Sequence, residues 1–285
     1  MIDTQLTRRF GLTLPILGAP KPWVADGRLA SEICKAGALG ILGAGPCDKD
    51  WIKTQFLTAG GISVACGLDC DRLRTEPEML EFVLSFQPRA IYLYGGDPRP
   101  FAKTIHRSCS RLICEARAVA ERDAILEAGA EVIVIRGAGE DSSNATNTSF
   151  ALVPELSDYL YTKDDEIILV ASGSVTDARG LAAMLTLGAD GVCMGRRFWA
   201  TPECALQGDA LIQALGAQAH LADMVQFVQP LLWTIGSRAE RILASMPRKI
   251  VKEPPGPGTS GVLNLDLTIG NRTSKQALKG VTNGK

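Results

Sequence analysis

Residues 167–198 constrain the fold of this chain more than any other stretch. They read as a strand, a glycine-containing turn, a helix, a second strand and a second glycine-containing turn. The first apolar run leads into the residues ASGS at 171–174, and the second leads into GRR at 195–197. In parallel α/β barrels, neighbouring strands that end in such loops often form a phosphate site, because glycine lets backbone N–H groups approach an anion. The stretch therefore predicts a barrel that holds a phosphorylated cofactor.

A strand–helix alternation runs along most of the chain. Eight apolar runs are predicted as strands, at residues 15–19, 39–42, 62–66, 90–94, 112–116, 132–135, 167–170 and 191–194. The runs are apolar throughout instead of alternating, which fits a parallel sheet covered by helices. We therefore predict an α/β fold, a (β/α)8 TIM barrel with a C-terminal helical extension. An open doubly wound sheet is the alternative, and the lack of a GxGxxG motif after the first strand disfavours it.

The chain divides into three predicted segments. Residues 1–215 would form the barrel, with its last helix over residues 202–215. Residues 216–252 would form a helical excursion that packs on the barrel and could cover its mouth. Residues 253–285 begin with the linker EPPGPG and continue as a polar tail.

Composition excludes several classes of function. The formal net charge of the 285 residues is −1, which argues against nucleic acid or an anionic membrane as the main partner. No apolar run reaches the ~18 residues that a membrane span needs, and the N-terminus does not read as a secretory signal. The eight cysteines form no CxxC pair, so we expect reduced, buried thiols and no metal site. These features favour a cytoplasmic protein with a small-molecule substrate, and a homo-oligomer stays open.

Five stretches carry a resemblance to a known family. In chain order they read PILGAPKP, SEICKAGALGILGAG, IYLYGGDP, ASGSVTDARGLAAML and LGADGVCMGRRFWATPE. Together they resemble the nitronate monooxygenase (2-nitropropane dioxygenase) family of FMN-dependent barrels, to which flavin-dependent enoyl-acyl-carrier-protein reductases are related. The resemblance covers residues 6–207. It implies an FMN-dependent oxidoreductase of the monooxygenase or reductase type.

The resemblance also implies where the cofactor binds. Four residues of the two glycine-containing turns would surround the FMN phosphate: Ser172, Gly173, Ser174 and Gly195. Arg196, which stands where the family has Thr, could pair with phosphate oxygens. The flavin ring would lie against residues at or just after the ends of the first and third strands: Ala19, Pro20 and Gly67. The alternative for each glycine is a helix cap or a tight turn without a ligand.

The expected catalytic loop departs from the family pattern. After its sixth strand the family has Gln-Gly-x-Glu-Ala-Gly-Gly-His, whose His is the implied catalytic base, whereas residues 136–143 here read RGAGEDSS. Ser142 or Ser143 falls at the place of the His, and a lone Ser hydroxyl is a poor base near neutral pH. We therefore expect a small or medium organic substrate other than a simple nitronate.

Charged residues of the same region are the remaining catalytic candidates. Arg136 replaces the family's Gln, and a cation there would stabilise anionic reduced flavin. Its alternative is an ion pair with Glu140 or Asp141 at the barrel rim. These two carboxylates are the preferred acid/base candidates, although an exposed acidic loop would look the same.

Three polar residues near other strand ends complete the candidates. Asp69 and Tyr94 are further acid/base candidates, at or near the ends of the third and fourth strands. Lys21, which follows the first strand, could bind an acidic substrate or be a solvated loop lysine.

Other functions stay open at this point. NAD(P)H or O₂ could serve as co-substrate, since barrels can bind a nicotinamide without a Rossmann motif. The same barrel could act as an isomerase or dehydratase without net redox change, with Arg136 as electrophile and Asp141 as base. It could also be a barrel that binds a ligand without catalysis.

Overall fold

Eight parallel strands form a closed barrel in the computed structural model, which describes residues 2–137, 147–163, 166–173, 175–206, 208–215 and 226–245. Their hydrogen-bonded order is β1-β8-β7-β6-β5-β4-β3-β2. Backbone bonds close the gap between the ends of this sheet: Gly18 N donates to Leu39 O at 2.8 Å, and Leu39 N donates to Ile16 O at 3.0 Å. The predicted TIM barrel is confirmed. The strands are β1 (Ile16–Gly18), β2 (Ile41–Gly43), β3 (Ala65–Asp69), β4 (Ala90–Tyr94), β5 (Arg111–Ala116), β6 (Val132–Arg136), β7 (Ile168–Ser172) and β8 (Gly191–Met194).

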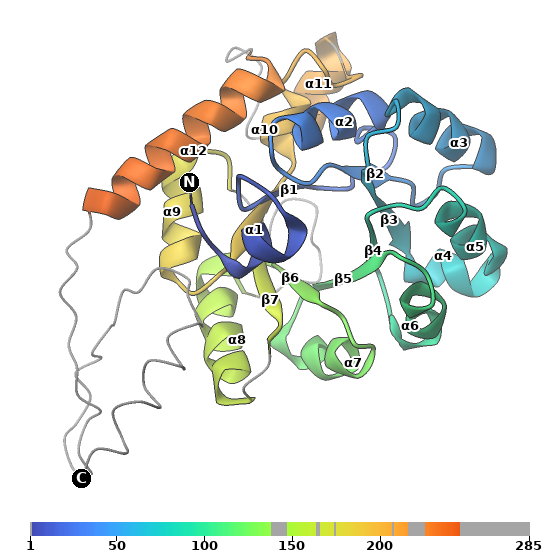
Figure 1. Cartoon of the computed structure of the whole chain (residues 1–285), viewed down its shortest axis with the longest axis horizontal. Coiled ribbons are helices and arrows are strands. Elements are labelled where there is room, and N and C mark those ends of the chain that lie inside the picture. The colour runs from blue at the N-terminus through green and yellow to red at the C-terminus, as the bar shows by residue number, and fades with distance from the viewer. Residues whose placement is uncertain are drawn as a thin grey trace.

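Helices surround the barrel (Figure 1). Aspartates begin several of them, since a carboxylate at the N-cap satisfies a free backbone N–H. Asp26 accepts from Leu29 N at 2.8 Å, and Asp48 accepts from Trp51 N at 2.7 Å. The outer helices are α2 (Gly27–Lys35), α3 (Lys49–Thr58), α4 (Cys70–Thr75), α5 (Glu78–Leu84), α6 (Arg99–His106), the 3₁₀ turn η1 (Val119–Glu121), α7 (Arg122–Glu127), α8 (Ser149–Lys163), α9 (Ala178–Thr186), α10 (Arg196–Trp199), α11 (Gly208–Leu215) and α12 (Val228–Ser245).

The N-terminal end of the barrel is plugged by α1 (Gln5–Phe10). A capping box between Thr4 and Thr7 begins this helix. Leu6 and Phe10 are fully buried and join the cluster of inward-facing strand side chains. That inner cluster fills the barrel like the packed layers of other TIM barrels. Its strand members include Leu17, Ile41, Ala65, Tyr92, Ile113, Val134, Val170 and Cys193.

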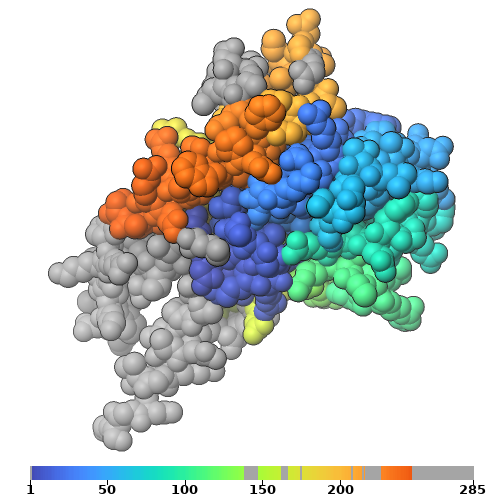
Figure 2. Space-filling view, turned by 45° about the horizontal axis from the view of Figure 1, so that its top comes forward, coloured from blue at the N-terminus to red at the C-terminus, as the bar shows by residue number. Residues whose placement is uncertain are grey.

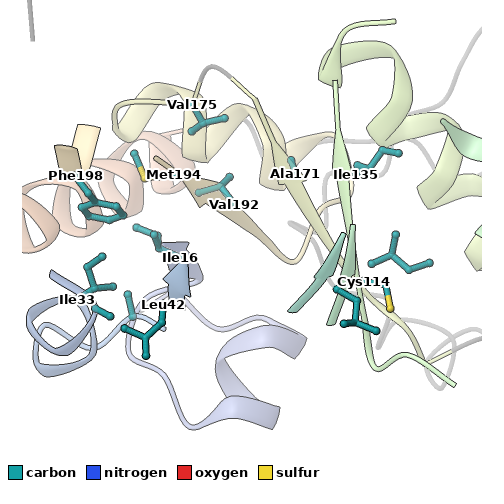
Figure 3. Close-up of a cluster of buried hydrophobic side chains, with 14 of the residues drawn as sticks. Ile16, Ile33, Leu42, Cys114, Ile135, Ala171, Val175, Val192, Met194 and Phe198 are labelled. Atoms are coloured by element: carbon teal, nitrogen blue, oxygen red, sulfur yellow. The ribbon is translucent and has the colours of Figure 1, made fainter. Parts of the chain in front are cut away.

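Outward-facing strand residues form a second core with the helices. Figure 3 shows Ile16 of β1 and Met194 of β8 in this cluster, together with Phe198 of α10 and Ile33 of α2. Burying each such side chain stabilises the fold by about 1.5–3 kcal/mol. The two cores together hold β8 and β1, and with them the loops at their C-terminal ends, in fixed positions.

The long helix α12 lies on the outside of the barrel, packed against α9 and α2 (Figures 1 and 2). Gly236 lets α12 also approach the segment before β1, because a Cβ there would lie 2.5 Å from Leu14 Cδ2. None of the residues that line the cavity described below comes from α12. This part of the predicted excursion therefore joins the outer ring and does not cover the mouth. Residues 216–225 and 246–285 lie outside the described residues.

The last barrel helix was predicted over residues 202–215, and its predicted start was wrong. Residues 201–206 are turns and irregular backbone, and α11 begins at Gly208. Glu203 contacts the start of α12, where its Oε1 accepts the backbone N–H of Val228 at 2.9 Å. This contact ties the segment after β8 to the helix that completes the ring.

The cysteines are free thiols, as the sequence predicts, with Cys109 exposed and Cys34 half-buried. Among the described residues, no group of three or more His, Cys, Asp or Glu side chains could hold a metal ion. Every helix in those ranges is too short or too polar to cross a bilayer.

Candidate functional site

A cavity of about 770 Å³ opens at the C-terminal ends of the barrel strands. Parallel barrels place their active sites at this face, and small-molecule sites typically measure roughly 300–1,000 Å³. The cavity brings together most of the predicted site residues that lie in the described ranges. These lining residues are Ala19, Pro20, Lys21, Arg136, Ser172, Gly173, Gly195 and Arg196.

Of the predicted cofactor residues that the structure describes, Gly67 is the one that does not line the cavity. A Cβ on Gly67 would lie 2.5 Å from Pro20 Cβ, so Pro20 covers it. β3 runs to Asp69, whereas the sequence predicted its end at residue 66. Gly67 therefore lies within the strand and not after it. Asp69, also a predicted candidate, takes the place at the cavity.

Four predicted site residues lie outside the described residues. They are Glu140, Asp141 and Ser143 of the expected catalytic loop, and Ser174 of the first glycine-containing turn.

The outer helix α6 carries His106, whose Nε2 lies 2.8 Å from the carbonyl oxygen of Ala128. This contact joins α6 to the end of α7, and His106 does not line the cavity.

The two glycine-containing turns form one wall of the cavity. Gly173 has φ +109°, a conformation that side-chain-bearing residues rarely adopt. Gly195 allows a close approach, because a Cβ there would lie 3.2 Å from Ala19 Cβ and 3.3 Å from the Trp199 ring. Backbone at the ends of β7 and β8 is thus held beside the cavity, with Arg196 on the same wall. Backbone of this kind, at the ends of two neighbouring strands, suits an anionic group such as a phosphate.

A second wall, next to the first, holds a buried carboxylate that no sequence pattern had identified. Glu115, on the inward face of β5, has a side chain only 8% exposed. Its Oε2 accepts a hydrogen bond from the Tyr92 hydroxyl at 2.8 Å. Its Oε1 lies 3.5 Å from Arg117 Nε and 3.5 Å from Arg136 Nη1. The partner of Arg136 within the described residues is therefore Glu115. The signal available in the sequence was Glu115 and Arg117 at alternate positions, on one face of the end of an otherwise apolar strand, in RLICEAR.

This environment decides which groups around Glu115 carry charge. Burial, and then the nearby Glu115 carboxylate, raise the pKa of Tyr92 well above its usual value. Burial, with a smaller effect of Glu115, raises the pKa of the Cys193 thiol to about 12. Both groups therefore stay protonated near neutral pH and cannot act as bases there.

Two further charged residues at the cavity are occupied by structural contacts. Arg72 donates to the backbone carbonyls of Gly45 and Cys47, and pairs with Glu76 Oε2 at 2.9 Å. Asp69 Oδ1 accepts the backbone N–H of Asp71 at 2.9 Å and so begins α4. These contacts hold the loops after β2 and β3 around the cavity.

Comparison with known proteins extends this description. A family model described as nitronate monooxygenase matches residues 72–229, more than half of the chain. The chain is 28% identical over 230 residues to a nitronate monooxygenase of Neurospora crassa, covering 67% of this chain and 61% of that protein. It is 26% identical over 207 residues to the (3aS,4S,5R,7aS)-5-hydroxy-7a-methyl-1-oxo-octahydro-1H-indene-4-carboxyl-CoA dehydrogenase of Rhodococcus jostii, covering 71% of this chain and 56% of that protein.

A solved structure supports the fold. FabK from Thermotoga maritima superposes with a TM-score of 0.72 at 18% identity, covering 86% of this chain and 98% of that one. The chain spans about three-fifths of the length of the two curated relatives. The matched family model includes β4 to β8 and the cavity residues that they carry. The chain belongs to the nitronate monooxygenase family.

Proposed function

We propose that this protein is an FMN-dependent oxidoreductase that acts on a small or medium organic substrate and is not a standard nitronate monooxygenase. The observation that carries the proposal is the cavity at the barrel mouth. One of its walls consists of the glycine turns at the ends of β7 and β8, and the other carries Glu115, Arg117 and Arg136. Membership of the family supports the choice of cofactor.

In this proposal the chain holds FMN at the first of these walls. Backbone amides near Gly173 and Gly195 bind the phosphate, with Arg196 beside them, and the ring lies against Ala19 and Pro20. FMN, when bound, supplies reversible electron transfer to and from the substrate. Arg136 borders the site, since it pairs in register with Ser172 of β7. A guanidinium there favours negative charge on the nearby edge of the ring.

The missing histidine supports a reaction other than nitronate oxidation. Residues 136–143 contain no His, and the buried Tyr92 and Cys193 stay protonated. We propose Glu140 or Asp141 of that stretch as the acid/base group. The dehydrogenase of Rhodococcus jostii is named for a reaction of another kind, so relatives of this chain are not confined to nitronates.

The co-substrate is the remaining part of the proposal. We propose that NAD(P)H donates electrons to the flavin-bound protein, or that O₂ accepts electrons from it. An anaerobic titration of the FMN-loaded protein with NADH and with NADPH, followed by absorption, tests the first step. Bleaching of the flavin by one donor, and its return on admission of air, are expected. Flavin that is bound but reacts with neither donor nor O₂ would favour the isomerase or dehydratase alternative.

A further inference from the structure

We propose that the cavity binds a carboxylate group of the substrate through Arg117, with Arg136 on the second side of the anion. Glu115 positions both guanidinium groups for this contact. The inference deepens the proposed function and rests on it, because it names the chemical class of the substrate that would meet the flavin.

The strand register brings the two arginines together. Ala116 of β5 pairs with Ile135 of β6, so the residues that follow them, Arg117 and Arg136, lie side by side. Both line the cavity, as does Glu115 between them. Arg136 is also the neighbour of Ser172, on the wall assigned to FMN. Arg117 therefore lies on the side of Arg136 away from that wall, where the substrate would be.

The guanidinium groups are only partly engaged. Each lies 3.5 Å from the same oxygen of Glu115, longer than the ~2.7–2.9 Å of a strong charged hydrogen bond. Within the described residues, Glu115 is the single polar partner of the side chains of Arg117 and Arg136. An arginine carries five N–H donors, so most of those on these two residues are left for a ligand.

The net charge of the groups around Glu115 favours a ligand that carries one negative charge. Glu115 balances one of the two arginines, while its other neighbours, Tyr92 and Cys193, are neutral. One positive charge is left over at a wall that is partly shielded from water. The planar fork of a guanidinium matches the two oxygens of a carboxylate. The phosphate-type cradle lies at the other wall, so the two walls suit two different anions.

Calorimetric titration of the FMN-loaded protein with hexanoate and with hexanamide tests the inference. The two probes have nearly the same size and differ in charge. We expect hexanoate to bind with a Kd near or below ~1 mM, and hexanamide to bind at least about tenfold more weakly. Arg117→Gln should weaken hexanoate binding at least about tenfold and leave hexanamide unchanged. Arg117→Lys keeps the charge and loses the planar fork, so its hexanoate affinity should lie between those of the unaltered protein and Arg117→Gln.

The controls separate this inference from the proposed function. Arg99→Gln removes an arginine from the outer helix α6, where it pairs with Asp97 and Glu127, and should leave hexanoate binding unchanged. The affinity for FMN should be the same in Arg117→Gln as in the unaltered protein. Equal binding of hexanoate and hexanamide, or an unchanged hexanoate affinity in Arg117→Gln, overturns the carboxylate site. If the protein takes up no FMN, the proposed function fails, and the same titration of the protein as purified still decides the carboxylate site.

Discussion

The hydroxyl of Tyr92 in β4 donates a hydrogen bond to Glu115 Oε2 of β5 inside the barrel, with 2.8 Å between the two oxygens. The contact joins two neighbouring strands at the base of the cavity, and it gives a buried carboxylate a hydrogen-bond donor. Glu115 in turn lies between the two arginines of the cavity wall. The Tyr92–Glu115 pair is therefore the structural link between the packed interior of the barrel and its polar mouth.

Removal of the Tyr92 hydroxyl should destabilise the protein. Tyr92→Phe leaves the buried Glu115 oxygen without that donor, and we expect the free energy of unfolding to fall by about 1–3 kcal/mol. Tyr94→Phe is the matched control, because the Tyr94 hydroxyl has no hydrogen-bond partner in the part of the chain that the structure describes, and it should change stability less. Urea unfolding of both variants measures the difference. Equal stabilities for the two variants would contradict the role given to this hydrogen bond.

The sequence predicted the barrel, the glycines of one cavity wall and Arg136 of the other, but not Glu115 or Arg117. Residues 167–198 were sufficient for β7, α9 and β8, because apolar runs and glycine turns are local signals. The end of β3 was misplaced, since the run at residues 62–66 is apolar while the hydrogen-bonded strand extends to Asp69. Glu115 was missed because its burial depends on partners from other strands, Tyr92 and Arg136, which no local pattern brings together.

Substitution of the turn glycines should weaken FMN binding. In Gly173→Ala the methyl group strains a backbone at φ +109°, and in Gly195→Ala it presses on Ala19 and Trp199. We expect each change to raise the Kd for FMN at least about tenfold, the equivalent of about 1.4 kcal/mol. Quenching of FMN fluorescence measures the affinity. Gly61→Ala is the control, since Gly61 also has a positive φ, +80°, but has open space around it. A similar loss in that variant would show that backbone strain alone, and not the cradle, lowers the affinity.

Stability should fall at alkaline pH, in part because of Cys193. Burial raises the pKa of this thiol to about 12 in the folded protein, from its ordinary value of 9.0. Between these two pH values the unfolded chain has lost the proton and the folded chain has kept it, so unfolding becomes more favourable as pH rises. At pH ~10 this single group should cost about 1.4 kcal/mol relative to pH ~8.

Cys193→Ala isolates this effect. The variant loses packing at every pH, but its loss of stability between pH ~8 and pH ~10 should be smaller by about 1.4 kcal/mol than that of the unaltered protein. Chemical denaturation at the two pH values measures both slopes. Parallel slopes would show that the Cys193 thiol does not titrate differently in the two states.

Nitronates should be poor substrates. The stretch at residues 136–143 has no His, so the proton transfer that the family's base performs lacks its usual group. We expect steady-state assays of the FMN-loaded protein with alkyl nitronates to give turnover well below the ~1–10³ s⁻¹ that is typical of enzymes. Ser143→His introduces the family's histidine, and its nitronate turnover is compared with that of the unaltered protein. Turnover in the typical range by the unaltered protein would contradict the proposed departure from nitronate chemistry.

The visible absorption spectrum of the purified protein tests the central claim, that the barrel mouth holds FMN, most directly. We expect the two absorption bands of a bound flavin, either as purified or after addition of FMN, with FMN identified by chromatography after heat release. Gly195→Ala should retain less of the flavin than the unaltered protein does. A colourless, folded protein that ignores added FMN would contradict the claim. The cavity at the barrel mouth would then serve a ligand other than flavin.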